Sequence, residues 1–276
     1  MLGCGQVDPL SKPTAVQRFT VLEWLEHSLE ELTPTQSSSS AFHPRRVFAE
    51  SSSRLFPTVL PVLLQVSAVL RYLHSEVSAP VPDEGQPEND SCAGSAGKLE
   101  IIHRAVIPEH FRFNGDSPQA GGVKLTSFMA CHLTWLPPPP NRETGAGTGT
   151  GTRTTTGRGS SGKLEWCAAP HHPTTALCYT PPEVAMRLSL STKADIYAFA
   201  LLAWQLMKSR KPYSGLSKSD FMYRVIYKSK RPKISRSWSE SFSSLLEACW
   251  LSEPVGRPPM HVVHNNLLVI CQQINE

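Results

Sequence analysis

The chain has 276 residues, of which 40% are hydrophobic and 18% charged, and its formal net charge is +4. The hydrophobic share excludes a wholly disordered chain, and so small a net charge gives no reason by itself to expect nucleic-acid binding. The 24 prolines make up about 9% of the residues, against about 5% in ordinary proteins, so part of the length is not expected to pack.

The termini and cysteines indicate the cellular compartment. The chain contains no apolar run of about 18 residues, the minimum for a membrane-spanning helix. Its first residues lack the basic and apolar regions of a secretory signal. Seven scattered cysteines without a Cys-x-x-Cys pair favour reduced thiols. We therefore expect a cytoplasmic protein without a membrane span.

Three stretches rich in Ser, Pro, Gly or Thr are predicted to be disordered insertions: residues 33–56, 76–100 and 137–162. Such compositions bury too little apolar area to offset about 1–2 kcal/mol of backbone entropy per ordered residue. The last stretch is a Gly/Thr repeat that follows four prolines.

The remaining segments show hydrophobic periodicity. Apolar residues recur every three or four positions from Val59 to Leu73, which predicts an amphipathic helix that ends near His74. Phe111 and Phe113 are expected to form a short strand pair with residues 123–125. Residues 194–207 are apolar nearly all round and predict a helix at the centre of a domain. Further helices are expected over 219–227, 241–250 and 261–274, so the fold should be mainly α.

Seven short segments contain motif-like residues in a fixed order: 21–26 (VLEWLE), 62–75 (VLLQVSAVLRYLHS), 101–110 (IIHRAVIPEH), 123–129 (VKLTSFM), 179–183 (YTPPE), 195–200 (DIYAFA) and 249–258 (CWLSEPVGRP). Together they resemble the protein kinase fold from the hinge onward. The residues Asp195-Ile196-Tyr197 and Cys249-Trp250 in the last two segments favour the tyrosine-kinase or tyrosine-kinase-like branch. The resemblance implies a mainly α, C-lobe-like domain with a few short strands over residues 21–276. It also implies that residues 1–20 are unstructured or a remnant of an N-lobe that is largely missing.

Five positions depart from the kinase pattern. Ala105 stands where the family has the Asp that accepts the substrate proton, and Ile107 where a Lys is common. His110 stands at the Asn that holds the second Mg²⁺, and Ser127 at the Asp of the Asp-Phe-Gly motif. Met129 replaces the Gly of the same motif, which loses the freedom in φ that Gly provides.

These departures predict a catalytically inactive kinase-like module, a pseudokinase. Since residues 1–20 alone precede the hinge-like segment, we expect no nucleotide-binding loop or Lys, and no productive binding of ATP or Mg²⁺. Gly3-x-Gly5 is not expected to be such a loop, because it lacks flanking strands and a third Gly. The module would act by protein–protein contacts as a scaffold or allosteric regulator in signalling, through partners that the sequence does not identify. In the alternative, the chain is a fragment of a longer, ATP-binding protein kinase whose N-lobe lies upstream.

The resemblance assigns structural roles to six retained residues: His103, Arg104, Phe128, Glu183, Asp195 and Arg257. Glu183 and Arg257 would form a buried ion pair. Asp195 would cap the backbone of the loop that begins at His103. His103 and Phe128 would contribute to an internal apolar stack.

Two further groups of residues have open interpretations. Cys167, His171, His172 and Cys178 carry donor atoms suited to zinc, but their spacing matches no standard finger, and they are more simply loop residues. Residues 152–161 offer hydroxyls beside Arg, so this stretch is either a phosphorylation target or a solvated tether.

Residues 187–236 hold 12 Lys and Arg against two Asp. This basic region could bind an acidic protein or an anionic surface, which makes a polyanion-binding module a second alternative function. It could equally be a solvated face. No interleaved aromatic pattern of an RNA-reading domain accompanies it, so nucleic acid is not the expected partner.

Overall fold

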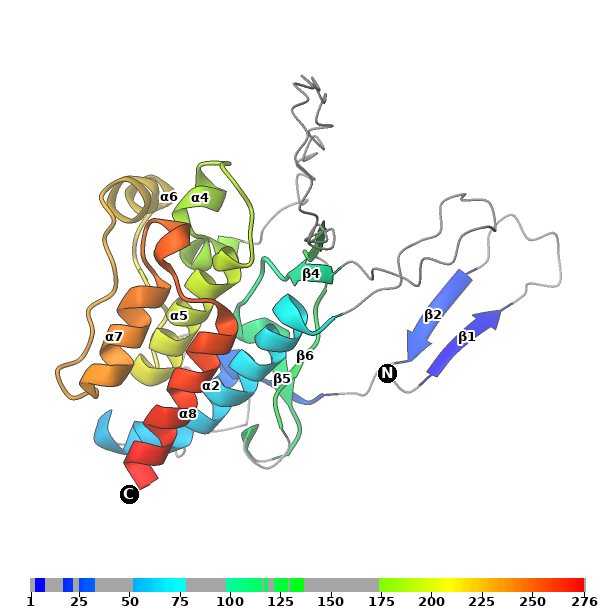
Figure 1. Cartoon of the computed structure of the whole chain (residues 1–276), viewed down its shortest axis with the longest axis horizontal. Coiled ribbons are helices and arrows are strands. Elements are labelled where there is room, and N and C mark those ends of the chain that lie inside the picture. The colour runs from blue at the N-terminus through cyan, green and yellow to red at the C-terminus, as the bar shows by residue number, and fades with distance from the viewer. Residues whose placement is uncertain are drawn as a thin grey trace, which may run out of the picture.

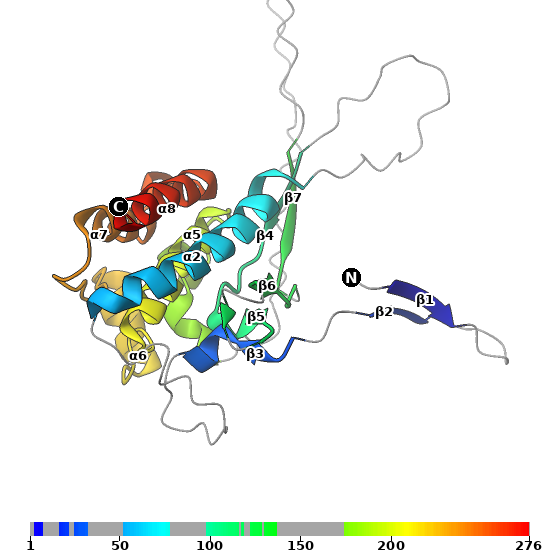
Figure 2. The same cartoon turned by 90° about the horizontal axis from the view of Figure 1, so that it is seen from below.

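A computed structural model describes residues 3–7, 17–21, 25–32, 52–77, 98–115, 117–118, 122–128, 130–136 and 174–275. Four long helices form the main body: α2 (Ser52–Ser75), α5 (Lys193–Lys208), α7 (Glu240–Cys249) and α8 (Met260–Asn275). Helix α2 packs along α8 and α5, and α7 packs against both α5 and α8 (Figures 1 and 2). The prediction of a mainly α fold is confirmed.

Helix α5 is the centre of the core. Every residue from Ala194 to Met207 is buried, as the apolar run predicted. The helix begins after Thr192 and ends at Ser209, whose φ of 47° places it in the left-handed conformation that commonly terminates helices. Each fully buried aliphatic side chain in such a helix contributes about 1.5–3 kcal/mol to folding. The segments that α5 contacts are therefore held by a rigid central element.

A small three-stranded antiparallel sheet lies beside the helices, in the order β3 (His27–Ser28), β5 (Phe111–Phe113), β6 (Lys124–Leu125). Phe111 pairs with Leu125 and Phe113 with His27. The predicted strand pair between residues 111–113 and 123–125 is confirmed. Both Phe side chains are fully buried, whereas Arg112 between them is half-buried, which is the alternation expected of a strand with one face on the core.

Two strand pairs were not predicted. Strand β4 (Lys98–Ile102) pairs with β7 (His132–Leu136), and β1 (Gly3–Val7) pairs with β2 (Gln17–Val21), both antiparallel. Residues 1–20 were expected to be unstructured or a remnant of an N-lobe; the first alternative does not hold for residues 3–7 and 17–20, and Gly3 and Gly5 lie in a strand. Backbone ladders need no hydrophobic pattern, so composition alone could not reveal them.

Two predicted insertions are shorter than expected. Helix α2 already includes residues 52–56, and β4 includes 98–100. The Ser-rich first turn of α2 carries no apolar period, so the pattern could not locate its start. The other parts of the insertions, residues 33–51, 78–97 and 137–162, lie outside the described residues.

The helix predicted over 219–227 is a short α-helix, α6 (Lys218–Asp220), that continues as a π-helix, η4 (Phe221–Tyr227). The buried residues of η4 are Phe221, Val225 and Ile226, at spacings of four and five. A π-helix has hydrogen bonds between residues five apart, which this wider spacing fits. The other predicted helices lie within one or two residues of α7 and α8.

Short helical segments connect these elements: η1 (Leu29–Leu32), η2 (Pro108–His110), η3 (Thr174–Tyr179), α4 (Pro182–Ala185) and η5 (Pro254–Gly256). Within the described ranges, none of the helices is both long and apolar enough to cross a membrane. Among the described residues, Cys131, Cys178, Cys249 and Cys271 form no disulfide.

Candidate functional site

The loop that corresponds to the kinase catalytic loop runs from His103 to Ile107 between β4 and η2. Asp195, in the first turn of α5, holds the start of this loop. Its Oδ2 accepts from the backbone N of His103 at 2.7 Å and its Oδ1 from the backbone N of Arg104 at 2.8 Å. Arg104 has a φ of 65°, and the two bonds compensate for this unfavourable conformation. Asp195 thus makes the backbone contacts that the resemblance implies.

The buried carboxylate of Asp195 has a third partner that the sequence did not suggest. His74, in the last turn of α2, places Nε2 2.9 Å from Asp195 Oδ2, and Asp195 is fully buried. The carboxylate therefore joins three segments: the end of α2, the start of α5 and the loop. His74 and Asp195 are 121 positions apart in the sequence, so no local sequence pattern predicts this contact.

The two positions at which the resemblance implies a catalytic Asp and a Lys are buried and apolar in this chain. Ala105 and Ile107 are 6% and 3% exposed, and Val106 between them is fully buried. A cavity of about 20 Å³ lies beside the loop, between Ala105, Ile107 and the Pro181 end of α4. This volume holds about one water molecule. Methyl and aliphatic groups supply no proton acceptor and no metal ligand at these two positions.

His110, at the position of the metal-binding Asn, is engaged inside the loop. Its Nδ1 lies 2.9 Å from the carbonyl oxygen of Ala105, so the imidazole N–H donates to the loop backbone. Its ring also meets that of His103 edge-on, with 5.9 Å between the centroids. Burial lowers the pKa of His110. The Nδ1 of this neutral imidazole is thus already hydrogen-bonded, and the side chain stabilises the conformation of the loop.

His103 is 1% exposed and donates from Nε2 to the carbonyl oxygen of Ser127 at 2.6 Å. This bond joins the loop to the segment that corresponds to the Asp-Phe-Gly motif. Its Nδ1 has no hydrogen-bond partner among the described residues. Burial lowers the pKa of His103, so the ring stays neutral in the folded protein at pH 7.

The resemblance implied that Phe128 contributes to an internal apolar stack, but the side chain is largely exposed. Its ring meets His103 edge-on at 6.1 Å between centroids, but the side chain is 54% exposed. Among the described residues, His103 provides the one ring that Phe128 contacts. Ser127 is half-buried, and Met129 lies outside the described residues.

Lowering the pH from 7 to 5 is expected to destabilise the fold through His103 and His110. Burial lowers both pKa values below the ordinary value of about 6.5. The unfolded chain therefore binds more protons, and the stability present above pH 6.5 is lost as the pH falls towards the folded pKa. Urea unfolding at several pH values measures this loss.

The variant His103→Gln should show a shallower fall in unfolding free energy between pH 7 and 5 than the unchanged chain. Replacing the exposed His261 on α8 with Gln provides the matched control, and this change should leave the slope as it is. Identical slopes for all three proteins would contradict the assignment of His103 as a buried, neutral imidazole.

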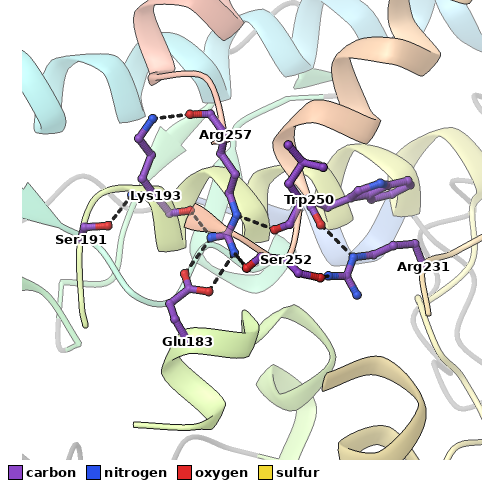
Figure 3. A network of polar contacts seen from close by, with 8 residues as sticks. Glu183, Ser191, Lys193, Arg231, Trp250, Ser252 and Arg257 are labelled. Carbon is purple, nitrogen blue, oxygen red and sulfur yellow. Dashed lines mark hydrogen bonds and ion pairs between the residues drawn. The ribbon is translucent and has the colours of Figure 1, made fainter. Parts of the chain in front are cut away.

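Glu183 and Arg257 make the buried ion pair that the resemblance implies (Figure 3). The contact is bidentate, with Arg257 Nη1 2.7 Å from Glu183 Oε1 and Nη2 2.8 Å from Oε2. Arg257 also donates to three backbone carbonyl oxygens, of Leu251 at 2.8 Å, Lys193 at 2.8 Å and Ser252 at 3.2 Å. All five N–H groups of the guanidinium are therefore used.

Arg231 is a second internal guanidinium, which sequence reasoning placed only in the basic region. It donates from Nε to the carbonyl oxygen of Trp250 at 2.8 Å and from Nη2 to Ser252 Oγ at 3.0 Å (Figure 3). Arg231 and Arg257 both lie against the ring of the buried Tyr197, at 5.2 and 5.0 Å from its centroid. No local sequence signal separates Arg231 from its exposed basic neighbours.

Of the four residues considered for zinc, Cys178 alone lies among the described residues. Cys178 is buried, and burial raises the pKa of its thiol to about 12, which disfavours the thiolate that binds metal. Cys167, His171 and His172 lie outside the described residues. Within the part of the chain that the structure describes, no group of three or more His, Cys, Asp or Glu side chains could hold a metal ion.

Comparison with known proteins locates the kinase likeness in the second half of the chain. The family model for protein tyrosine and serine/threonine kinases matches residues 167–267. That range contains Glu183, Asp195 and Arg257. The segments 101–110 and 123–129 lie outside it, so the roles assigned to their residues stay predictions.

Curated relatives agree with this match. The chain is 37% identical over 86 residues to a protein of Dictyostelium discoideum described as a "Probable serine/threonine-protein kinase", covering 31% of this chain and 9% of that protein. It is 34% identical over 95 residues to the serine/threonine-protein kinase STY17 of Arabidopsis thaliana, covering 34% and 15%. It is 32% identical over 81 residues to the dual specificity protein kinase shkC of Dictyostelium discoideum, covering 29% and 16%.

The chain thus spans less than a fifth of each of these three relatives, the largest share being 16%. Within that span the motifs that carry the resemblance, from Tyr179 to Pro258, coincide with the matched region and with the buried network around Arg257. The C-terminal part of the chain is therefore kinase-like, of the tyrosine-kinase and tyrosine-kinase-like kind that the sequence predicted.

Proposed function

We propose that the chain is a kinase-like module that does not transfer phosphate and that acts through protein–protein contacts, as a scaffold or allosteric regulator in signalling. The observation that carries this proposal is the loop between β4 and η2. Its backbone is held by the carboxylate of Asp195, yet Ala105 and Ile107 line it with apolar groups. A preserved loop without its proton acceptor can support binding but not general-base catalysis, a contribution of about 10²–10⁴-fold.

The free thiols of the described cysteines support a reducing, cytoplasmic location for this function. ATP and Mg²⁺ are not part of it, because His110 is engaged with the loop backbone and Ser127 offers only a hydroxyl where the family uses a carboxylate. Regulation would then depend on which partner occupies the surface of the helical body.

One observation favours a second candidate. The relatives are named as kinases, and the matched span is at most 16% of the three described above. A chain that is part of a longer protein kinase would have the same matched helices. In that case the longer protein would bind ATP and transfer phosphate to protein substrates.

Thermal unfolding with ATP tests the first candidate, and mapping the full-length transcript tests the second, because an upstream exon that encodes a Gly-rich loop and its Lys would favour the kinase fragment. We expect the Tm to be the same without nucleotide, with ATP, and with ATP and Mg²⁺, and no transfer of labelled phosphate to a general protein substrate. A ligand present at 100 times its Kd would stabilise the folded chain by about 2.7 kcal/mol, which corresponds to several degrees in Tm.

The double variant Ala105→Asp/Ser127→Asp introduces the two Asp side chains that the kinase family has at these positions. It is the matched control, because the rest of the chain is unchanged. A Mg²⁺-dependent rise in Tm that the unchanged chain already shows would overturn the proposal and favour the kinase fragment. A rise that appears only in the double variant would support it, because the missing carboxylates would then be the reason for the loss.

A further inference from the structure

The basic region has an internal part and an exposed part, which the structure separates. Arg231 and Lys193 point inward: Arg231 donates to the carbonyl oxygen of Trp250, and the ammonium of Lys193 donates to that of Arg257. Both side chains are half-buried and hydrogen-bonded within the fold, so the exposed cations of the region are the more accessible groups for an anion.

The exposed cations of the region include Arg187, Arg210, Lys233 and Arg236, and a further group lies on α6, η4 and the residues after them. We name it the Tyr/Lys surface, and its residues are Lys218, Tyr223, Arg224, Tyr227, Lys228 and Lys230. All six side chains are exposed, the two tyrosines by 59% and 65%. The opposite side of η4 packs inward through Phe221 and Val225.

The π-helix places these residues side by side. Residues four and five apart are neighbours in such a helix, so Tyr223 faces both Tyr227 and Lys228. The ammonium of Lys228 lies 5.7 Å from the centroid of the Tyr223 ring. The backbone N of Lys230 donates to the carbonyl oxygen of Arg224 at 2.9 Å, which folds the following residues back onto the helix.

The positive charge of this surface is not neutralised by the described residues. Asp220 is the one acidic residue between 196 and 239, and it pairs with Arg224 at 3.3 Å. Within the described ranges, Lys218, Lys228 and Lys230 have no acidic partner within ion-pair distance. Three exposed ammonium groups therefore remain available to an anion, and that of Lys228 lies next to the Tyr223 ring.

We propose that the Tyr/Lys surface binds an acidic peptide segment, rich in Glu or Asp, of a partner protein. Carboxylates would pair with the ammonium groups, and the phenol hydroxyls would bond to the peptide backbone. Tyrosine and arginine are enriched at protein interfaces because they combine contact area with hydrogen bonding.

The two other polyanions fit this surface less well. Single-stranded nucleic acid binds by stacking bases on aromatic faces, and one face of Tyr223 is covered by the Lys228 ammonium. Membrane attachment by a surface helix combines charge with apolar side chains that enter the lipid, and none of the six residues of the Tyr/Lys surface has an aliphatic apolar side chain. Charge complementarity with a peptide is therefore the better match.

Fluorescence anisotropy with a labelled ten-residue Glu peptide tests the proposal. We expect binding that weakens as salt is raised from 50 to 300 mM, and no binding of a ten-residue Gln peptide. The variant Lys228→Glu should weaken binding about tenfold, because it replaces an attraction by a repulsion of similar size. Tyr227→Ala should weaken it several-fold.

The matched control is Lys124→Glu on β6, an exposed lysine whose reversal changes the net charge by the same amount. Figure 1 shows β6 on the other side of the helical body from α6. Circular dichroism should show that every variant is folded. Equal weakening by Lys124→Glu and Lys228→Glu, or no binding of the Glu peptide, would overturn the proposal.

Two probes assign the surface to another partner if the proposal is wrong. Binding of ten-residue oligouridylate that is stronger than that of the Glu peptide and lost in Tyr227→Ala would indicate nucleic acid. Stronger binding to phosphatidylserine vesicles would indicate a membrane. The Tyr/Lys surface does not include the loop with Ala105, so a negative peptide result leaves the proposed loss of phosphotransfer intact, and the ATP experiment leaves the peptide proposal intact.

Discussion

Replacing Arg257 with Ala is expected to lower the free energy of unfolding by about 3–5 kcal/mol. The change leaves the carboxylate of Glu183, 3% exposed, buried without its cation. It also removes the donors that three backbone carbonyl oxygens use, including that of Lys193. Urea unfolding followed by tryptophan fluorescence measures the loss, which would lower the Tm by about 10 °C in a domain of this size.

The exposed pair between Asp220 and Arg224 provides the control. Its side chains are 43% and 51% exposed and four residues apart, so Arg224→Ala should cost about 0.3–0.5 kcal/mol. If Arg257→Ala does not fold, Glu183→Gln keeps the shape of the site and should give a measurable, smaller loss. A loss of stability no larger for Arg257→Ala than for Arg224→Ala would refute the assigned role of the buried pair.

Replacing Asp195 with Ala is expected to cost about 3 kcal/mol or more, because it leaves buried donors without an acceptor. The backbone N–H groups of His103 and Arg104 and the Nε2 of His74 all bond to this carboxylate. Because two of these groups are backbone amides of the loop, hydrogen exchange at residues 103 and 104 should become faster than at the centre of α5.

Asp195→Asn retains one carbonyl oxygen and should cost less than Asp195→Ala. Asp220→Ala, which removes an exposed carboxylate from a helix start, is the matched control and should leave exchange in the loop unchanged. Amides at 103 and 104 that stay as protected in Asp195→Ala as in the unchanged chain would contradict the role of Asp195 in holding the loop.

The sequence predicted those features that depend on local pattern or on a retained motif. The nearly all-apolar run 194–207 predicted a buried helix, and the spacing from Val59 to Leu73 identified the body of α2. The partnership of Glu183 with Arg257 followed from the kinase motifs at 179–183 and 249–258. Each of these predictions required only a periodicity or a short string of residues.

Features that depend on distant pairing or on surroundings were missed. The pairing of β4 with β7 joins residues about 35 positions apart, and nothing local in either strand specifies it. Charge alone could not show that Arg231 points inward while Lys228 points outward. Phe128 stands at a motif position that is expected to be buried, but its side chain is exposed. Burial depends on which distant residues cover a side chain, and a short motif does not specify them.

The buried pair of Glu183 and Arg257 also has a consequence for how such a chain can change over generations. Losing either residue alone removes a large part of the marginal stability that most domains possess, so a path to an apolar replacement passes through a poorly folded intermediate. The presence of the pair is therefore explained by its contribution to folding, and it carries no information about phosphate transfer.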